Sequence, residues 1–393
     1  MIIHFHYSLT PHTGDVKRII NIDKEFADYF KEDTVEVIFC PVSQLKRVRG
    51  RDFFKLSKHT RTKYCVPLIP HSEFINQYYK SLIIAILCIV YKAKVLVGEW
   101  YFPSKMVGLI KLLMPKIRIF ADIHGAMVEE QLYLNPNIKE REIAKMRKCE
   151  EYTMANADHI ICQSTAMKHY IQSTYNIPQD KITVYRCGYD PNAFNYDVNK
   201  RNEIRENIGI KSTDTVFVYS GGLQKWQRID DCLNVFKQYH EQNNDSKMLI
   251  LTTEQSLIAQ ILQTTEYKDI KEAIFSMSVP FNSVSTYLNA CDIAFLIRDA
   301  VTMNIVASPT KLAEYFACGL PVISSNVAEH WVDEEAKPYI LDINSKTLNK
   351  DIDHTLNSTN RSKISEYAYK NLSLNKDHNT ITSYLKSLTS NQP

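Results

Sequence analysis

The chain has 393 residues, which is too many for one ordinary hydrophobic core and suits two domains of roughly 190 residues each. Hydrophobic residues make up 45% and charged residues 23%, a balance that excludes disordered and fibrous proteins. The net charge is only +3, and we expect no nucleic-acid partner. The most apolar run, Ser81–Val90, is far shorter than the ~20 residues of a membrane-spanning helix.

The first half of the chain alternates short apolar segments with stretches of helical periodicity. These short segments are apolar and often β-branched, and they predict strands over Ile2–His6, Val35–Cys40, Cys65–Ile69, Val95–Gly98, Ile117–Ile123, His159–Cys162 and Ile182–Tyr185. Strands of this kind, joined by helical crossovers, are typical of a parallel sheet that is covered on both faces.

A polar stretch from about Asn195 to Asp214 interrupts this pattern and is interpreted as a linker. The alternation then resumes, with strands predicted over Val216–Ser220, Met248–Thr252, Ala273–Ser278, Ile293–Ile297, Val322–Ser324 and Tyr339–Asp342. We therefore expect two doubly wound, Rossmann-like α/β domains over residues 1–200 and 201–374. A last helix over Asn375–Leu388 carries one apolar stripe, and residues 375–393 are expected to pack back on the first domain.

Two segments are rich in basic residues. Residues 46–63 contain eight Lys and Arg against one Asp, and they form either a solvated loop or a patch for lipid or acceptor phosphates. Residues 105–118 predict a short basic amphipathic helix, which either lies on an anionic membrane surface or covers the sheet. Nine scattered cysteines and the absence of a leader predict a cytoplasmic protein, peripheral at the inner face of the plasma membrane if these segments bind lipid.

The most informative segment is Val306–Ser325, which predicts a loop, a short helix, a tight turn and a strand. Ser308 suits the N-cap, Pro309 the first helical position and Gly319 the position just after the helix. The free N–H groups of such a helix and the charge of Lys311 suit a phosphate. Glu314, one turn further, suits the hydroxyl groups of a ribose. The alternative is an ordinary capped helix without a ligand.

This segment, from Ser308 to Ile323, resembles the donor-site signature of family 4 and related retaining glycosyltransferases of the GT-B fold. Four further stretches match the family in the same order, namely Asp122–Gly125, Ala157–Ser164, Cys187–Phe194 and Val216–Trp226. The resemblance therefore covers most of the chain. It implies two Rossmann-like domains that face each other across a cleft, the first for the acceptor and the second for a nucleotide-sugar donor.

The resemblance also assigns roles to single residues. Glu314 matches the second glutamate of the family's Glu–seven residues–Glu motif, and Val306 stands where the first is expected. The implied catalytic residues, near the donor sugar or its diphosphate, are His124, Lys225 and Lys311. The implied donor-binding residues are Gly222, Arg228, Asn304, Ser308, Pro309, Thr310 and Glu314, and the acceptor-side candidates are His12 and Gly14.

The implied activity is transfer of a sugar from a UDP- or GDP-sugar to a hydroxyl group, with retention of configuration and without a metal or cofactor. The acceptor is expected to be a glycan or lipid-linked saccharide in surface polysaccharide synthesis. The Asp351-Ile352-Asp353 triplet follows no predicted strand and is interpreted as a chance match to a metal motif. The alternatives are a GT-B nucleotide-sugar epimerase and a non-catalytic nucleotide-sugar-binding partner.

Overall fold

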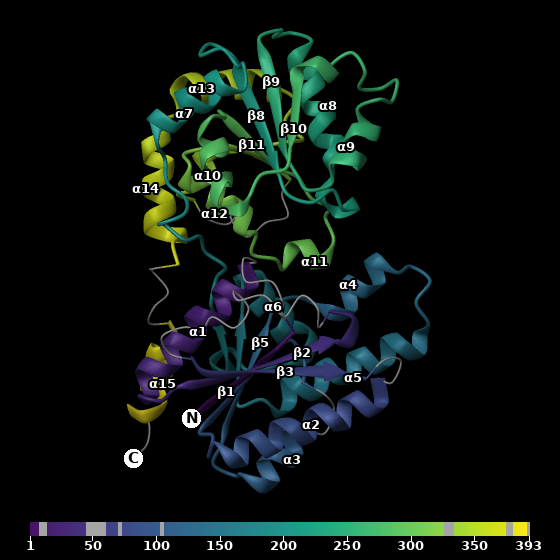
Figure 1. The fold of residues 1–393 in the computed structure, drawn as a ribbon, viewed down its shortest axis with the longest axis vertical. Helices are drawn as coiled ribbons and strands as arrows, with labels where there is room; N and C mark the ends of the chain where they lie inside the picture. Colours follow the sequence, from purple (N-terminus) through teal and green to yellow (C-terminus); the bar gives the residue numbers. More distant parts are fainter. Residues whose placement is uncertain are drawn as a thin grey trace. The chain divides into compact units, whose positions relative to one another are not determined.

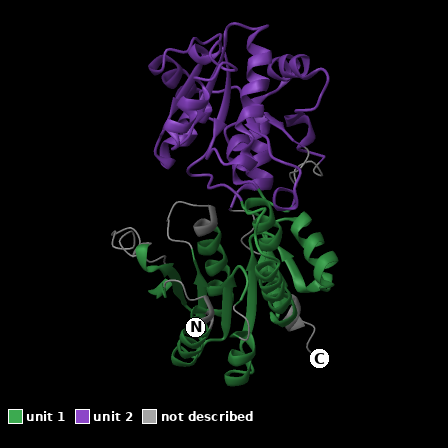
Figure 2. Ribbon diagram, turned by 90° about the vertical axis from the view of Figure 1, so that its right-hand side faces the viewer, with its two compact units in different colours: residues 1–187, 306–308, 377–393 green, residues 188–305, 309–376 purple. Residues whose placement is uncertain are grey.

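A computed structural model describes residues 1–7, 14–44, 60–69, 73–102, 106–325, 334–374 and 380–390. The chain forms two compact units (Figure 2). Unit 1 contains residues 1–187, 306–308 and 377–393, and unit 2 contains residues 188–305 and 309–376. The division thus falls after Cys187 rather than after residue 200, and a three-residue return segment of the second half belongs to unit 1.

Unit 1 is built on a seven-stranded sheet in the order β3-β2-β1-β4-β5-β6-β7, in which every neighbouring pair is parallel. The strands are β1 (Ile2–His6), β2 (Thr34–Pro41), β3 (Thr60–Leu68), β4 (Val95–Glu99), β5 (Arg118–Ile123), β6 (His159–Cys162) and β7 (Ile182–Val184). Each one overlaps a predicted strand, because near-continuous apolar runs are the signal of strands buried on both faces.

Helices cover both faces of this sheet (Figure 1). They are α1 (Gly14–Phe30), α2 (Glu73–Val90), α3 (Met106–Leu113), α4 (Met127–Leu134), α5 (Glu140–Asn156), α6 (Thr165–Tyr175) and α15 (Thr380–Ser390). On one face α2, α3, α5 and α6 pack against Ile3 and Phe5, and on the other face α1 and α15 pack against Ile2. Side chains alternate along a strand, so one face is apolar, whereas His4 and His6 put polar groups on the other.

Helix α15 lies on unit 1 beside α1 and β7. Ile381 and Leu385 are buried in its core, and the ring of Tyr384 stacks on His159 with a centroid separation of 3.5 Å. The main-chain N–H groups of Ile381 and Thr382 donate to the Glu25 carboxylate of α1. The predicted apolar stripe is therefore the face that contacts unit 1.

Unit 2 contains a six-stranded parallel sheet in the order β10-β9-β8-β11-β12-β13. Its strands are β8 (Thr215–Ser220), β9 (Ser246–Leu251), β10 (Ile274–Met277), β11 (Ile293–Leu296), β12 (Val322–Ser324) and β13 (Ile340–Asp342). Its helices are α7 (Val198–Asn207), α8 (Ile229–His240), α9 (Gln255–Ile261), α10 (Phe281–Asn289), α11 (Thr302–Ile305), α12 (Thr310–Ala317), α13 (Leu348–Ser358) and α14 (Arg361–Leu372). The predicted fold class, two doubly wound parallel-sheet domains, is confirmed.

The predicted linker over residues 195–214 is wrong, since this stretch contains α7. Asp197 caps the helix by accepting from the N–H groups of Asn199 and Lys200. Arg201 and Arg205 form ion pairs with Asp292 at 2.7 and 2.6 Å. Contacts with a residue almost ninety positions away stabilise this polar helix, so hydrophobic periodicity gave no sign of it.

The predicted start of the signature helix is also wrong. Helix α12 begins at Thr310, and Pro309 rather than Ser308 holds the N-cap position, with no side-chain cap. Pro309 has an extended backbone (φ −73°, ψ 109°), and a proline disfavours helical geometry in the residue before it, so Ser308 lies outside the helix. Gly319 follows the helix with φ +72°, as predicted.

No helix among the described residues combines the length and the apolar character that crossing a membrane requires.

Candidate functional site

The carboxyl end of β8 leads into a tight glycine turn in unit 2. Gly221 has φ +141°, a backbone conformation that favours glycine, and its N–H donates to the Leu251 carbonyl at 2.8 Å. The hydroxyl group of Tyr219 donates to the Gly222 carbonyl, and the N–H of Leu223 donates to Glu254 at 2.5 Å. These bonds hold the turn at the sheet edge where α/β proteins bind ligands.

Lys311, from the first turn of α12, lies over this glycine turn. A methyl group on Gly221 would collide with its Nζ, so a larger residue at this position requires the lysine side chain to move. Its ammonium donates to Oε1 of Gln227 at 3.0 Å and lies 4.9 Å from the ring centre of Tyr219. Two motifs separated by some ninety residues thus form one cationic cluster in unit 2.

The surroundings of Lys311 disfavour its charge. Burial, together with the nearby guanidinium of Arg298, which follows β11, lowers its pKa to about 7. Arg298 is half-buried, its pKa is also lowered by burial, and its Nε has no hydrogen-bond partner among the described residues. Among the described residues, Glu314 on α12 is the carboxylate that favours the charge of Lys311. Two half-buried cations with so little compensation favour an anionic ligand.

Of the other predicted donor-site residues of unit 2, Arg228 and Asn304 already have partners within the protein, and Lys225 is exposed. Arg228 forms ion pairs with Asp231 at 2.5 Å and with Asp299 at 2.6 Å, so its charge is already compensated. The amide of the buried Asn304 donates to the Asp299 carbonyl at 2.9 Å. Lys225 begins an exposed one-turn helix over Lys225–Gln227. Gly222 and Lys225 therefore lie in the segment that Lys311 contacts through Gln227, and Glu314 lies three residues after Lys311 on α12. Arg228 and Asn304 both contact Asp299 and hold the adjoining loop.

Residues 306–308 belong to unit 1. Val306, which stands where the family's first glutamate is expected, is buried in the core of unit 1. Its carbonyl accepts a hydrogen bond from the hydroxyl group of Ser164 at 2.7 Å. Its side chain therefore serves packing. Ser308, Pro309 and Thr310 are half-buried, and Thr310 is the first residue of α12.

A second charged cluster lies at the carboxyl edge of the unit 1 sheet. His124 follows β5, and its Nε2 lies 2.9 Å from Oδ2 of Asp122 and 3.7 Å from Oε1 of Glu99. Asp122 and Glu99 are register partners on β5 and β4, so the parallel sheet places both carboxylates side by side. Arg18 of α1 donates from Nε and Nη2 to the two oxygens of Asp122 at 3.0 and 2.5 Å.

These contacts set the charges in unit 1. Burial lowers the pKa of His124, but Glu99 and Asp122 outweigh it and raise the pKa to about 8. For Asp122 burial acts in the other direction and raises the pKa. The positive charges of Arg18 and His124 outweigh this effect, so the pKa of this carboxyl lies well below its usual range. His124 is therefore mostly protonated at neutral pH and donates hydrogen bonds from its ring.

The described residues include one group with the composition of a metal site, formed by Glu99, Asp122 and His124. One ligand atom from each lies within 4.8 Å of the others. Arg18 and His124 already occupy both oxygens of Asp122, so positive charge is supplied by the protein itself. In unit 2, Asp351 accepts from Ser345 and Thr347 and Asp353 from Tyr239, so this acidic pair serves α13.

Several predicted functional residues fall outside the described residues. They include His12 and the basic stretch from residue 46 to 59, whereas Gly14 begins α1. Lys63, the last residue of the basic segment 46–63, forms an ion pair with Glu36 at 2.9 Å. In the second basic segment α3 buries Met106, Val107 and Ile110 against the sheet, so this helix does cover the sheet.

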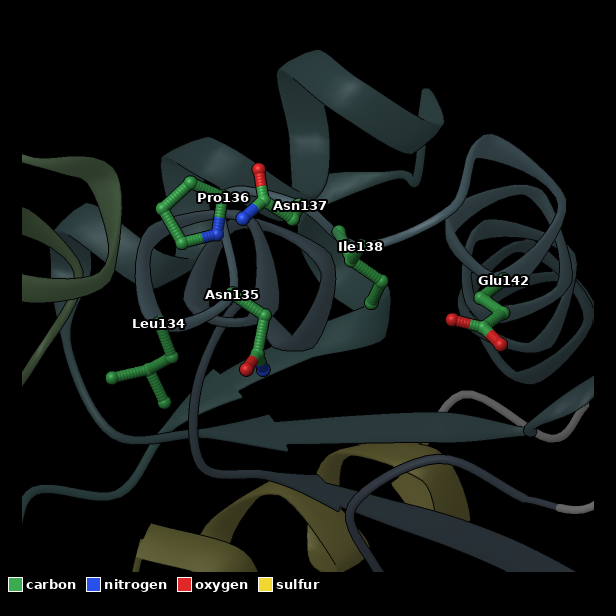
Figure 3. A pocket seen from close by; sticks show the side chains of 6 residues that line it. All are labelled: Leu134, Asn135, Pro136, Asn137, Ile138 and Glu142. Atoms are coloured by element: carbon green, nitrogen blue, oxygen red, sulfur yellow. The ribbon is translucent and has the colours of Figure 1, made fainter.

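A hollow of about 440 Å³ opens between α4 and α5 of unit 1 (Figure 3). The residues that line it are Leu134, Asn135, Pro136, Asn137, Ile138 and Glu142. The amide of Asn135 donates to Gln131 at 2.9 Å, and the lining contains no basic side chain. This hollow lacks the positive charge that a nucleotide requires.

The two halves of the chain match two families of glycosyltransferase. Residues 24–193 match Glycosyltransferase Family 4, and residues 200–371 match Glycosyl transferases group 1. The chain is a family 4, group 1 glycosyltransferase. The sequence resemblance is thereby confirmed, and the chain is an enzyme of the glycosyltransferase class. No sequence among the curated proteins matches the chain significantly.

Solved structures confirm the GT-B fold of this glycosyltransferase. Sucrose-phosphate synthase from Thermosynechococcus elongatus superposes with a TM-score of 0.74 at 13% identity, over 100% of this chain and 99% of that one. HepE of Anabaena in complex with UDP gives 0.71 at 13% identity, over 98% and 99%. WaaG, a glycosyltransferase involved in lipopolysaccharide biosynthesis, gives 0.69 at 14% identity, over 97% and 100%.

Sequence reasoning missed four residues that shape the two clusters of this glycosyltransferase. They are Arg18, Glu99, Gln227 and Arg298. Glu99 is the last residue of β4 and Arg298 follows β11, which was a visible signal, because a charge at the carboxyl end of a parallel strand lies at the ligand edge. Arg18 and Gln227 carried no such local signal.

Proposed function

We propose that this glycosyltransferase moves a sugar from a UDP- or GDP-sugar to a hydroxyl group of a glycan or lipid-linked saccharide, with retention of configuration. The observation that carries the donor part is the position of Lys311 over the Gly221 turn, near the half-buried Arg298. A diphosphate bound there compensates two cations that the protein leaves nearly uncompensated. HepE is known in complexes with UDP and UDP-glucose, so a UDP-sugar is the first donor to test.

The proposed reaction places developing negative charge against this cluster. As the bond from the anomeric carbon to the diphosphate breaks, Lys311, Arg298 and the first turn of α12 stabilise the leaving oxygens. The acceptor oxygen bonds to the anomeric carbon on the face that the diphosphate leaves, and its proton passes to a departing phosphate oxygen. No metal ion is needed in this scheme, because protein cations supply the charge.

The remaining assignments follow the family resemblance. Glu314 is proposed to accept hydrogen bonds from the ribose of the donor, and the protonated His124 to donate to an oxygen of the donor sugar. The acceptor and the cellular setting, a surface polysaccharide made at the inner face of the plasma membrane, are supported only by likeness. WaaG, which shares the fold, is involved in lipopolysaccharide biosynthesis.

The decisive experiment is a panel of UDP-, GDP- and ADP-sugars, read by thermal shift and by nucleotide release, with product analysis of any donor that is consumed. A new glycoside with retained configuration supports the proposal. An epimerised donor identifies an epimerase, and binding without turnover identifies a non-catalytic partner. If no donor raises the melting temperature, the donor site is refuted.

Two variants separate the parts of the donor site. Lys311→Ala is expected to weaken both nucleoside diphosphate and inorganic pyrophosphate, since Lys311 is assigned to the diphosphate. Glu314→Ala is expected to weaken the nucleoside diphosphate alone, because pyrophosphate has no ribose. Equal losses for both ligands in Glu314→Ala would contradict the ribose assignment.

A further inference from the structure

Helices α2 and α3 lie side by side on the apolar face of the unit 1 sheet (Figure 1). Each buries one side against the sheet, through Ile84, Ala85 and Cys88 of α2 and through Met106, Val107 and Ile110 of α3. Their opposite sides are also apolar. The exposed large hydrophobic residues of the two helices are Ile75, Tyr78, Leu82, Ile86, Ile89, Val90, Leu109, Leu112 and Leu113.

We call this surface the α2–α3 face. Its apolar residues on α2 are spaced so that they lie on one side of the helix. Along α2 its first five members recur every three or four residues, so they form one stripe beside the buried stripe. Leu82 is 57% exposed, Val90 66% and Leu112 79%. Single exposed apolar residues are ordinary, but nine on two neighbouring helices indicate an interaction site.

The charges around the α2–α3 face are mainly basic, and the acidic residue of the two helices is Glu73 at the start of α2. Residues 74–98 and 106–121 contain six Lys and Arg and no Asp or Glu. Lys94 pairs with Glu32, and Lys111 with Asp158, at the margins. Lys92 and Lys116 are exposed where the two helices end. In a symmetric dimer this face would meet a second copy of itself and bring like charges together, whereas an anionic bilayer would attract it.

We propose that the α2–α3 face docks unit 1 on an anionic lipid membrane, with its apolar side chains entering the outer part of the bilayer. An amphipathic surface with aliphatic side chains and flanking lysines binds in the plane of such an interface. Tyr78 adds an aromatic ring with a polar tip, which suits the headgroup region. This inference extends the membrane part of the proposed function and does not depend on the donor chemistry.

The test is flotation of the full chain with vesicles of phosphatidylglycerol and phosphatidylcholine in equal parts, beside vesicles of phosphatidylcholine alone. The wild type is expected to float with the anionic vesicles and much less with the neutral ones. Leu82→Glu with Ile86→Glu, or Leu112→Glu alone, is expected to lower binding about tenfold or more, because a charge then enters the apolar contact. Leu257→Glu and Tyr369→Glu in unit 2, also at exposed sites, are the matched controls and keep binding.

Donor hydrolysis is measured on the same variants. Intact hydrolysis with lost flotation supports the α2–α3 face, and failure of hydrolysis in the wild type concerns the proposed function alone. Equal binding of the wild type to neutral vesicles, unchanged flotation of the α2 and α3 variants, or a wild-type dimer that these variants dissociate would each overturn the proposal.

Discussion

His124 of unit 1 and Lys311 of unit 2 are both basic groups buried near the carboxyl ends of parallel strands, yet their pKa values move in opposite directions. Two carboxylates raise the pKa of His124 to about 8. Burial and Arg298 lower the pKa of Lys311 to about 7. The histidine thus has two carboxylates within 3.7 Å, whereas the effect of Glu314 on the lysine is outweighed by burial and by Arg298. The lysine cluster is therefore the one in which an anionic ligand would compensate the positive charge.

The largest expected effect tests whether Arg18 compensates the buried negative charge of Asp122 in unit 1. Arg18→Met should lower the free energy of unfolding by about 3–5 kcal/mol, because it leaves the buried Asp122 carboxylate without its partner. Arg147→Met is the matched control, since Arg147 pairs with Glu129 on the surface at 3.6 Å and should cost less than about 1 kcal/mol. Urea unfolding measures both, and equal losses would contradict the compensation.

The next effect tests the uncompensated cluster of unit 2. Lys311→Ala should lower donor turnover about a hundredfold or more with little loss of stability, since a charge at the leaving group acts mainly in the transition state. Lys237→Ala, at a half-buried lysine of α8 whose ammonium donates to the Glu266 carbonyl, should keep wild-type turnover. Steady-state kinetics with the best donor from the panel gives the comparison, and wild-type turnover in Lys311→Ala would refute the assignment.

Gly221→Ala tests whether the missing side chain at Gly221 allows Lys311 to take its position over the turn. The variant should lose donor affinity about tenfold, because the methyl group displaces Lys311, and should lose about 1–3 kcal/mol of stability through its positive φ. Gly209→Ala shares a positive φ of +73° but has open space, so it should lose stability while binding donor normally. Isothermal calorimetry and urea unfolding separate the two effects.

A pH series tests the sign of the His124 shift. The folded pKa of about 8 lies above the unfolded value of 6.5, so charged His124 stabilises the fold fully below pH 6.5. This stabilisation, about 2 kcal/mol, should disappear as the pH rises through 8. His124→Gln should lack this decrease. Urea unfolding at several pH values measures it, and parallel curves for the two proteins would contradict the shift.

The smallest expected effect, proton uptake on donor binding, tests the lowered pKa of Lys311. With a pKa of about 7, Lys311 is mostly neutral above that pH, and a bound diphosphate should return its charge. Donor binding near pH 8 should therefore take up about one proton, and the affinity should fall as the pH rises. Calorimetry in buffers of different ionisation enthalpy measures the uptake. Lys311→Arg should bind without it, and equal uptake would assign the proton elsewhere.

Much of the fold could be predicted from local patterns. Every described strand overlaps a predicted one, since apolar runs bounded by polar turns carry their own signal. Helix α7 could not be found in this way, because Arg201 and Arg205 obtain their stabilising partner, Asp292, from a distant segment. The start of α12 was placed at Ser308 because serine is a common N-cap, but the backbone of Pro309 delays the helix.

The two-domain organisation, the family and the candidates Lys311, Glu314 and His124 could all be found in the linear sequence, because they depend on spacing and residue type. The charges that these groups carry depend on the folded chain. Gly221 and Arg298 reach Lys311, and Glu99 reaches His124, from other segments of the chain. The tertiary structure also decided that one side of α2 remains exposed, because burial depends on which neighbours the folded chain supplies.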